Sequence, residues 1–228
     1  MSARETILRR IRDNLGRDDS AAGAVEERLG ARAAGPRPQR SQLPHAKQVD
    51  LFAEMAEEVD ATVARVEGNK AILDAIADYL SAHNLPARVV ISTDERLDDV
   101  PWEQRPTLEV RRGIAVEMDS VSVTPAFAGI AETGTVMAIS GKETPTTLNF
   151  LPENHIVILR ESEIVGTYEN GWQRLRKQTA MSGDAISMPR TVNFITGPSR
   201  TADIAMTLYL GAHGPRRLHI ILVADDGG

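Results

Sequence analysis

Residues 191–223, TVNFITGPSRTADIAMTLYLGAHGPRRLHIILV, decide the predicted fold of this chain. The stretch begins with a β-branched and aromatic run that stops at Gly197-Pro198, and it ends with a second apolar run. Between these runs, the apolar residues have helical spacing and follow Ser199, which is a good residue for a helix N-cap. The stretch therefore predicts a strand, a helix and a second strand, which is the βαβ crossover of a parallel sheet.

The junction after the first predicted strand is the place most open to a ligand. Gly197 permits a tight turn, and Ser199, Arg200 and Thr201 follow it. Their two hydroxyl groups and guanidinium would lie beside a helix N-terminus, where free N–H groups bind carboxylate or phosphate. A plainer interpretation is that Ser199 only caps the helix, Arg200 is solvated, and Asp203 interacts with the helix dipole.

The composition limits the classes of function. The 228 residues, 42% of them hydrophobic, are enough for one α/β domain with additional material. The chain has no cysteine, which excludes disulfides, thiolate zinc sites and cysteine-ligated iron–sulfur clusters within it. Its net charge of −6 gives no basic footprint for nucleic acid. Because the chain has no cysteine to hold an iron–sulfur cluster, any electron transfer must use a partner or a bound cofactor.

The sequence shows no membrane span and no targeting segment. No apolar run approaches the roughly 20 residues that a span requires. The arginine-rich N-terminus lacks the apolar region of a secretory signal, and Glu5 and Asp13 are acidic residues that organellar presequences avoid. We therefore expect a cytoplasmic protein.

The first 47 residues differ in character from the rest. Ser2 and Glu5 have the spacing of a capping box, and the helix that they predict has its apolar residues on one face, at Ile7, Leu8, Ile11 and Leu15. The segment that follows is rich in Ala, Gly, Pro and charge, without apolar periodicity. We expect residues 1–47 to be an N-terminal helix and flexible linker, and residues 48–228 to be one domain. The helix could dock on its own domain, a sister subunit or another partner.

Strand-like and helical segments alternate through the predicted domain. Besides the opening stretch, strands are predicted at 61–66, 88–91, 115–118, 121–124, 136–140 and 155–159, and helices at 49–59, 69–80 and 170–178. This alternation predicts an α/β fold with a mostly parallel or mixed sheet and helices on both faces.

A second polar loop, AFAGIAETGT at 126–135, lies between two predicted strands. Gly134 would let the backbone approach a ligand, while Glu132, Thr133 and Thr135 offer one carboxylate and two hydroxyl groups. Glu132 could be a base, an acyl-accepting nucleophile or an acceptor that orients a ligand. The same residues also fit a plain hairpin turn with Gly134 at positive φ.

A third loop, Gly211-Ala212-His213-Gly214-Pro215, precedes the last predicted strand. His213 is sterically accessible and could exchange protons or bind an anion, or it could only cap backbone carbonyl groups. The predicted helix would separate it from Ser199 by roughly 15 Å or more. We expect His213 to join that site only if the loop folds back or another subunit contributes it.

Other common sites have no support in the sequence. The five histidines show neither HxH nor HxxxH spacing, so no metal site is predicted. There is no GxGxxG, GxxxxGK[ST] or GxSxG motif for a dinucleotide, a nucleotide or a serine nucleophile.

Taken in order, three motifs resemble the lactate utilization protein C family, the LUD-domain proteins. They are AGIAETGT at 128–135, the segment LPENHIVIL at 151–159, and TGPSRTADI at 196–204 followed by LGAHGP at 210–215. Together they extend the resemblance over about residues 48–223. Ala205 stands where the family commonly has an acidic residue, which puts a role for that position in doubt.

The resemblance implies a fold similar to the sugar-phosphate isomerase and CoA-transferase superfamily. It also implies a part in oxidising L-lactate to pyruvate beside partner proteins that carry iron–sulfur clusters, with no cofactor on this chain. In that case the AETGT and GPSRTAD segments would face the ligand.

Three hypotheses follow. In the first, the chain is a non-redox component of lactate oxidation that binds a small carboxylate or organises its partners, with the carboxylate on Arg200, support from Ser199 and Thr201, and Glu132 orienting a hydroxyl group. In the second, it is a self-sufficient acyl or CoA transferase or sugar-phosphate isomerase that uses Glu132. In the third, it is a structural module without a ligand. The residues leave open whether it is a homo-oligomer.

Overall fold

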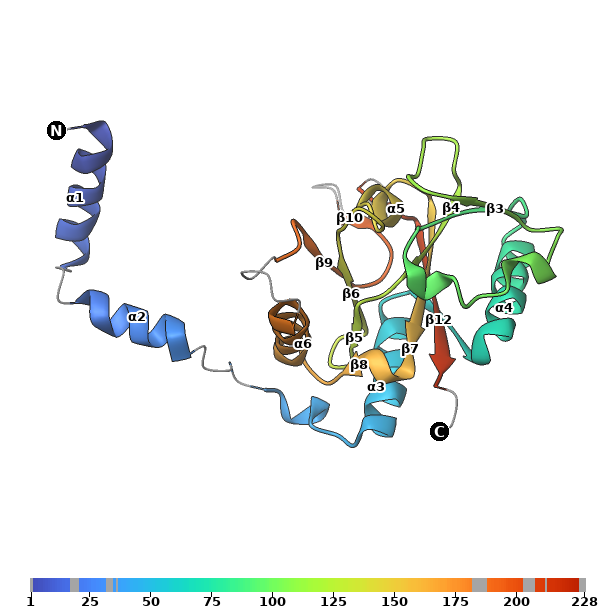
Figure 1. Cartoon of the computed structure of the whole chain (residues 1–228), viewed down its shortest axis with the longest axis horizontal. Coiled ribbons are helices and arrows are strands. Elements are labelled where there is room, and N and C mark those ends of the chain that lie inside the picture. The colour runs from blue at the N-terminus through green and yellow to red at the C-terminus, as the bar shows by residue number, and fades with distance from the viewer. Residues whose placement is uncertain are drawn as a thin grey trace. The chain divides into compact units, whose positions relative to one another are not determined.

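The computed structural model describes residues 2–16, 21–31, 35, 37–181, 188–202, 208–211 and 213–225. The chain forms two units, Met1–Pro36 and Arg37–Gly228 (Figure 1). The first contains helices α1 (Ala3–Leu15) and α2 (Ala21–Ala31), and the second contains the β-sheets and the other described helices.

Helix α1 begins at the capping box that the sequence predicts. The Ser2 hydroxyl accepts the Glu5 N–H, the Glu5 carboxylate accepts the Ser2 N–H, and Gly16 ends the helix in the left-handed conformation. Helix α2 lies inside the segment predicted to be a flexible linker, so that prediction is wrong for residues 21–31. Its alanines have the highest helix propensity of any residue, which explains a helix without a pronounced apolar face.

The larger unit is built on a six-stranded main sheet in which every neighbouring pair of strands is parallel. Its strands are β1 (Thr62–Glu67), β2 (Arg88–Ile91), β3 (Glu109–Arg112), β4 (Val121–Pro125), β7 (Asn154–Arg160) and β12 (Arg217–Ala224). They lie in the order β1-β12-β7-β4-β2-β3. The predicted segments 61–66, 88–91, 121–124, 155–159 and 218–223 are therefore confirmed as strands.

Both faces of the main sheet are covered. Helix α4 (Gly68–Ala82) packs on one face, where its Ile72 and Ile76 contact the core formed by Ile156 and Ile221. Helix α3 (His45–Glu58) packs on the other, where Phe52 joins the residues that alternate with these along the same strands. The predicted fold class, an α/β sheet with helices on both faces, is confirmed.

A second sheet of four strands, in the order β8-β5-β6-β9, lies on the α3 side. Its strands are β5 (Ala128–Ile130), β6 (Thr135–Ile139), β8 (Ile164–Val165) and β9 (Val192–Ile195). Helix α6 (Tyr168–Met181) covers its outer face, so that α4 and α6 lie on opposite sides of the two sheets in Figure 1. A side chain at Gly171 of α6 would lie 2.9 Å from Ile130, which shows how closely this helix packs.

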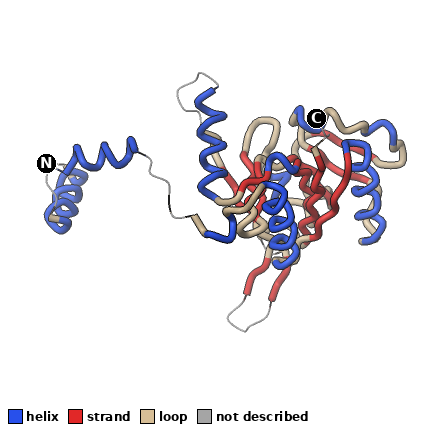
Figure 2. The backbone as a smooth tube through the Cα atoms, turned by 90° about the horizontal axis from the view of Figure 1, so that it is seen from below, coloured by secondary structure: helices blue, strands red, loops and turns tan. Residues whose placement is uncertain are grey.

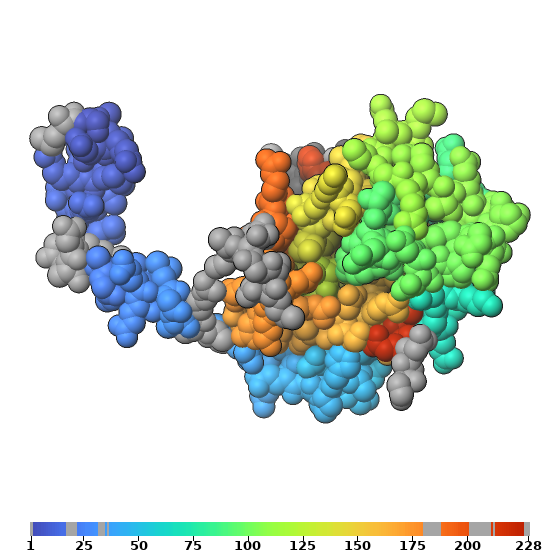
Figure 3. Space-filling model, in the orientation of Figure 1, coloured from blue at the N-terminus to red at the C-terminus, as the bar shows by residue number. Residues whose placement is uncertain are grey.

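Short helical turns fill the remaining connections. The α-helical turn is α5 (Thr147–Phe150), and the 3-10 turns are η1 (Gln39–Ser41), η2 (Glu95–Leu97), η3 (Trp102–Gln104) and η4 (Glu161–Glu163). The strand predicted at 115–118 is wrong, because Asp119 accepts the Val116 N–H and pairs with Arg111 to fold this segment into a loop. The loop projects from the surface in light green in Figure 3.

The predicted βαβ crossover is also wrong. Strand β9 pairs with β6 in the second sheet, whereas β12 lies in the main sheet. Between them, β10 (Arg200–Ala202) and β11 (Leu208–Leu210) form an antiparallel hairpin instead of the predicted helix, and its two strands extend away from the domain in Figure 2. The sequence is consistent with strands at these positions. Leu208 and Leu210 are two residues apart, which is the side-chain period of a strand, and Thr201 is β-branched and so favours a strand.

Candidate functional site

Four of the predicted ligand-binding residues line one cavity of about 250 Å³, which we call the Ser199 pocket. They are Gly197, Ser199, Arg200 and His213, and the other lining residues are Phe150, Phe194, Ile195, Thr196, Pro198, Gly214 and Pro215. Of the predicted residues near them, Asp203 lies outside the described residues, and only the backbone of Thr201, in β10, is described.

His213 and Ser199 are neighbours in the structure. The His213 N–H donates to the Ser199 hydroxyl at 3.3 Å, the Ser199 N–H donates to the Pro215 carbonyl at 2.8 Å, and the Gly211 N–H donates to the Ser199 carbonyl at 2.9 Å. The predicted separation of roughly 15 Å between Ser199 and His213 is therefore wrong. A helix would place the two residues at its opposite ends, whereas the antiparallel strands β10 and β11 bring them together.

Arg200 is held at the end of α3. Its guanidinium donates to the Asp60 carboxylate at 2.6 Å and to the Val59 carbonyl at 2.8 Å. Gly197 has a φ of 69°, and a side chain there would lie 2.2 Å from the same Val59 carbonyl. Only glycine fits this approach, so the end of α3 fixes one wall of the Ser199 pocket.

Glu132 serves a different part of the fold. It is buried, and its carboxylate accepts the N–H of Tyr168, the first residue of α6, at 3.0 Å. This carboxylate therefore stabilises the N-terminus of α6. Glu132 does not line the Ser199 pocket. Gly134, with a φ of 60°, approaches α3 so closely that a side chain would lie 2.1 Å from the Ala56 nitrogen.

The two predicted loops nevertheless meet through hydroxyl groups. The Thr135 hydroxyl lies 2.7 Å from that of Thr196, 2.7 Å from that of Thr133 and 3.0 Å from that of Tyr168. Thr196 lines the Ser199 pocket, so this chain of hydroxyl groups connects the pocket to the loop that holds Glu132. The hydroxyl contact therefore brings Thr135 next to Thr196, but neither Thr135 nor the Glu132 carboxylate lines the Ser199 pocket.

A second cavity, of about 390 Å³, lies at the carboxyl edge of the main sheet. Asp94 and Arg96 follow β2, Phe127 follows β4, and Glu163 follows β7. Strands β2 and β4 are neighbours in the main sheet. The next main-sheet strand in the sequence after β2 is β3, which lies on one side of this pair, and the next after β4 is β7, which lies on the other side. This reversal is the place where open α/β sheets characteristically bind ligands. We call this cavity the switch-point pocket.

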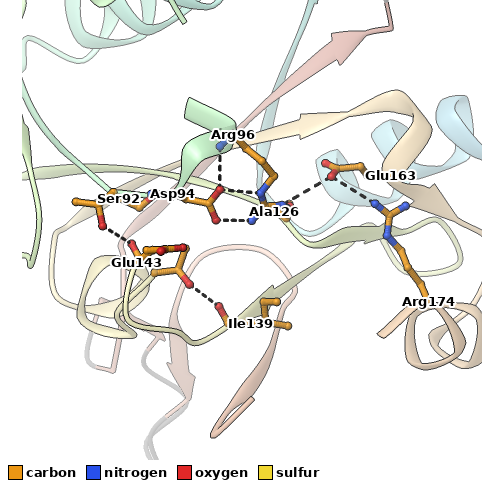
Figure 4. Close-up of polar contacts among 10 residues, drawn as sticks. Ser92, Asp94, Arg96, Ala126, Ile139, Glu143, Glu163 and Arg174 are labelled. Atoms are coloured by element: carbon orange, nitrogen blue, oxygen red, sulfur yellow. Dashed lines mark hydrogen bonds and ion pairs between the residues drawn. The ribbon is translucent and has the colours of Figure 1, made fainter. Parts of the chain in front are cut away.

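One ion pair in the switch-point pocket is closely made. The Arg96 guanidinium donates to both oxygens of Asp94, at 2.9 and 2.8 Å, and to the Ala126 carbonyl at 2.5 Å (Figure 4). Burial acts to raise the pKa of Asp94, but the hydrogen bonds and charge of Arg96 outweigh burial and hold that pKa below its usual value. Asp94 and Arg96 therefore hold each other in position at one side of the pocket, and their opposite charges cancel.

A second, looser group lies beside it. Glu163 Oε1 is 3.4 Å from Arg174 and 3.7 Å from Arg96 (Figure 4). Its other oxygen accepts the Arg160 N–H at 3.3 Å. Burial raises the pKa of Glu163, and the nearby arginines offset only part of this effect. The Arg174 guanidinium lies over the Phe127 ring, 5.5 Å from its centre.

The sequence prediction missed the residues of the switch-point pocket. They come from five separate segments, and none of them belongs to a recognisable motif. The only indication was positional, because Asp94 and Glu163 closely follow predicted strands that end at residues 91 and 159.

Two further features concern only the described residues. Within them, no three His, Asp or Glu side chains gather closely enough to hold a metal ion. In the same part of the chain, no helix combines the length and the apolar character needed to cross a membrane.

Comparison with known proteins identifies relatives along nearly the whole chain. The family model described as the LUD domain matches residues 49–223. The chain is 30% identical to a lactate utilization protein C from Exiguobacterium sp., over 97% of this chain and 96% of that protein. It is 29% identical to a protein of the same name from Halalkalibacterium halodurans, over 97% of this chain and 98% of the relative.

A solved structure supports the fold. The crystal structure of a DUF162 family protein from Deinococcus radiodurans aligns with a TM-score of 0.56 and 22% sequence identity. The alignment covers 79% of this chain and 99% of that protein. At this level of identity the similarity concerns the arrangement of helices and strands, not the chemistry of a site.

Proposed function

This chain belongs to the LUD domain family, and from that membership we propose that it takes part in lactate utilisation, the process for which its relatives are named. We place it there as a component that carries no iron–sulfur cluster, acts with partners that do, and binds a small carboxylate. The absence of cysteine supports the first point, because such clusters are held by cysteine thiolates. The proposal keeps the cytoplasmic location expected from the sequence.

The carboxylate site in this proposal is the Ser199 pocket. The observation that carries it is the kind of polar group in the lining. Arg200, His213 and the Ser199 hydroxyl line the cavity, and no Asp or Glu does among the described residues. Such a lining suits a carboxylate such as lactate or pyruvate. The proposed contacts are the Arg200 guanidinium and the Ser199 hydroxyl group.

The existing partner of Arg200 does not prevent this role. Asp60 is largely exposed, and an exposed ion pair contributes only about 0–1 kcal/mol. A ligand carboxylate can therefore share or replace Asp60 at little cost. The Val59 carbonyl would still hold the other side of the guanidinium in position.

Glu132 has a positioning role in the proposal. Its carboxylate holds the start of α6, and Tyr168 at that point belongs to the hydroxyl chain that reaches Thr196. A transferase or isomerase mechanism would need Glu132 free to attack or to accept a proton from substrate. No contact of Glu132 favours that mechanism, and we do not extend the proposal to it.

Calorimetric titration of the full chain with L-lactate and with pyruvate tests the site. We expect Arg200→Gln to raise the Kd for pyruvate at least tenfold, equivalent to about 1.4 kcal/mol. Arg65→Gln is the matched control, because Arg65 is also an exposed arginine in an ion pair with an aspartate. Binding that is equally strong in Arg200→Gln would contradict the assignment, as would a complete absence of binding.

A second measurement tests the dependence on partners. The purified chain alone should reduce no electron acceptor in the presence of lactate. The complex isolated from native cells through a tag on this chain should contain iron and should reduce the acceptor. Lactate oxidation by the isolated chain would overturn the non-redox role.

A further inference from the structure

The two pockets lie at opposite edges of the main sheet. Phe150 and Pro215 line the Ser199 pocket and precede β7 and β12, whereas Phe127 and Glu163 line the switch-point pocket and follow β4 and β7. Because all six strands are parallel, these positions mark the amino edge and the carboxyl edge, respectively. A ligand in one pocket therefore does not occupy the other.

Arg174 has longer polar contacts than Arg96, the other arginine of the switch-point pocket. Its guanidinium lies 3.4 Å from Glu163 and 3.5 Å from the Ser162 carbonyl, whereas Arg96 makes contacts of 2.5–2.9 Å. A guanidinium–carboxylate pair normally closes to about 2.7–2.9 Å. Arg174 can therefore take a closer anion, and the Phe127 ring beneath it restricts the direction of approach.

Glu163 places an acceptor next to this donor. An ionised carboxylate only accepts hydrogen bonds, and Glu163 Oε1 faces both arginines across the same cavity. The pocket thus offers a guanidinium for a carboxylate and, beside it, an oxygen for a hydroxyl hydrogen. A carboxylate with a hydroxyl group on the adjacent carbon presents the complementary pair of groups.

The overall charge of the lining limits the ligand further. Among the described residues, Asp94, Glu95, Glu143 and Glu163 line the cavity together with two cations, Arg96 and Arg174. This excess of negative charge repels di- and tricarboxylates and phosphates more strongly than a monocarboxylate, because they carry more negative charge. The volume of about 390 Å³ admits a side chain larger than the methyl group of lactate.

We propose that the switch-point pocket is a second small-molecule site, which binds an α-hydroxy monocarboxylate in preference to the corresponding keto acid. Arg174 binds the carboxylate, and Glu163 accepts the hydrogen of the α-hydroxyl group. A keto acid has no such hydrogen and would place its carbonyl oxygen against the Glu163 carboxylate. Sites that use a hydrogen bond in this way discriminate strongly against analogues that lack the donor. This site goes beyond the carboxylate binding proposed for Arg200 and does not depend on it.

Three ligands with the same carbon skeleton test the proposal: L-lactate, pyruvate and propionate. Each is titrated calorimetrically into the full chain carrying Arg200→Gln, so that the Ser199 pocket does not contribute. We expect L-lactate to bind at least tenfold more tightly than pyruvate or propionate. Equal affinities, or no lactate binding in this background, would overturn the proposal.

Substitutions within the pocket assign the contacts. Adding Arg174→Gln should weaken lactate binding at least tenfold, while Lys177→Gln, which removes an exposed charge from the same helix, should leave it unchanged. Glu163→Gln supplies an amide donor in place of the acceptor, so it should reverse the preference toward pyruvate. Circular dichroism and the urea midpoint verify that each variant is folded, and Arg174→Lys replaces Arg174→Gln if that variant is not. A preference for lactate that survives Glu163→Gln would overturn the role of Glu163.

The same data separate this proposal from the proposed function. Lactate binding that is lost with Arg174→Gln but kept with Arg200→Gln supports the switch-point site and contradicts the Ser199 site. The opposite pattern contradicts the switch-point site alone.

Discussion

The Ser199 pocket and the switch-point pocket differ in how the chain builds them. Turns and the base of a hairpin form the Ser199 pocket, with its cation paired to an exposed aspartate. Strand ends and α6 form the switch-point pocket, in which Asp94 pairs with Arg96 and Glu163 with Arg174, all four partly buried. The first pocket offers hydrogen-bond donors without a carboxylate, and the second offers donors and carboxylates together. The same parallel sheet therefore provides two sites with different hydrogen-bonding character at its two edges.

A pair of glycines, one from each pocket, provides the largest expected contrast. Gly197→Ala should destabilise the fold by about 3 kcal/mol, because its φ of 69° is unfavourable for alanine and the added carbon would lie 2.2 Å from the Val59 carbonyl. Gly141→Ala in the switch-point pocket should change stability by less than about 0.5 kcal/mol, because its nearest neighbour would be 3.4 Å away. Urea unfolding of both variants gives the two free energies.

The glycine pair also tests how each pocket depends on α3. In Gly197→Ala we expect the Ser199 pocket to lose carboxylate binding even where the chain is folded, since Val59 also holds Arg200. Similar free energies for the two variants would show that α3 does not fix the Ser199 pocket. Binding at the switch-point pocket in folded Gly197→Ala serves as the internal control.

Acid should affect both pockets together, through His155. This residue is fully buried in β7, the strand that runs between the two edges, and burial lowers its pKa to about 3 from the usual 6.5. Below pH 6.5 the unfolded chain gains a proton that the folded chain does not. Stability should therefore fall by up to about 1.4 kcal/mol per pH unit between pH 6.5 and pH 3. Above pH 6.5 this residue should have no such effect.

Urea unfolding at pH 6.5, 5.5 and 4.5 measures this slope. His219, whose pKa burial lowers to about 4, should add an effect of the same sign over the range above pH 4. The variant His155→Gln keeps a polar group for the Thr124 hydroxyl, which lies 2.7 Å from His155 Nε2, and should flatten the slope. An unchanged slope in that variant would show that His155 does not cause the acid sensitivity.

Much of the fold could be predicted, because most elements carry their own pattern. The strand 88–91 and the amphipathic face of α4 are recognisable from apolar spacing within a few residues. The segment 200–210 could not be predicted in this way, since its apolar residues have a spacing that predicted a helix, although the spacing of two between Leu208 and Leu210 also fits a strand. Pairing of Thr201 with Tyr209 decides between them, and pairing depends on contacts between separate segments.

The two pockets differ in the same respect. Two loops of the sequence each combine glycine with polar side chains, so residue types alone indicated a site at Gly197, Ser199, Arg200 and His213. The switch-point pocket joins residues from separate strand ends and α6, and only the strand order brings them together. That order comes from the pairing of strands that are separated in the sequence, such as β4 with β7, so residue patterns alone could not provide it.

The smallest expected effect comes from Thr135, which connects the Ser199 pocket to the Glu132 loop. Thr135→Val preserves the shape of this buried side chain but removes the hydroxyl within 3.0 Å of Thr133, Tyr168 and Thr196. We expect a loss of about 1 kcal/mol in the free energy of unfolding, the usual net value of a buried hydrogen bond. Thr107→Val, at an exposed threonine, should be nearly neutral. If the hydroxyl chain positions Thr196, calorimetry should also show weaker carboxylate binding in the Ser199 pocket and unchanged binding in the switch-point pocket. Equal weakening in both would mean that Thr135 supports the whole domain instead of one edge of its sheet.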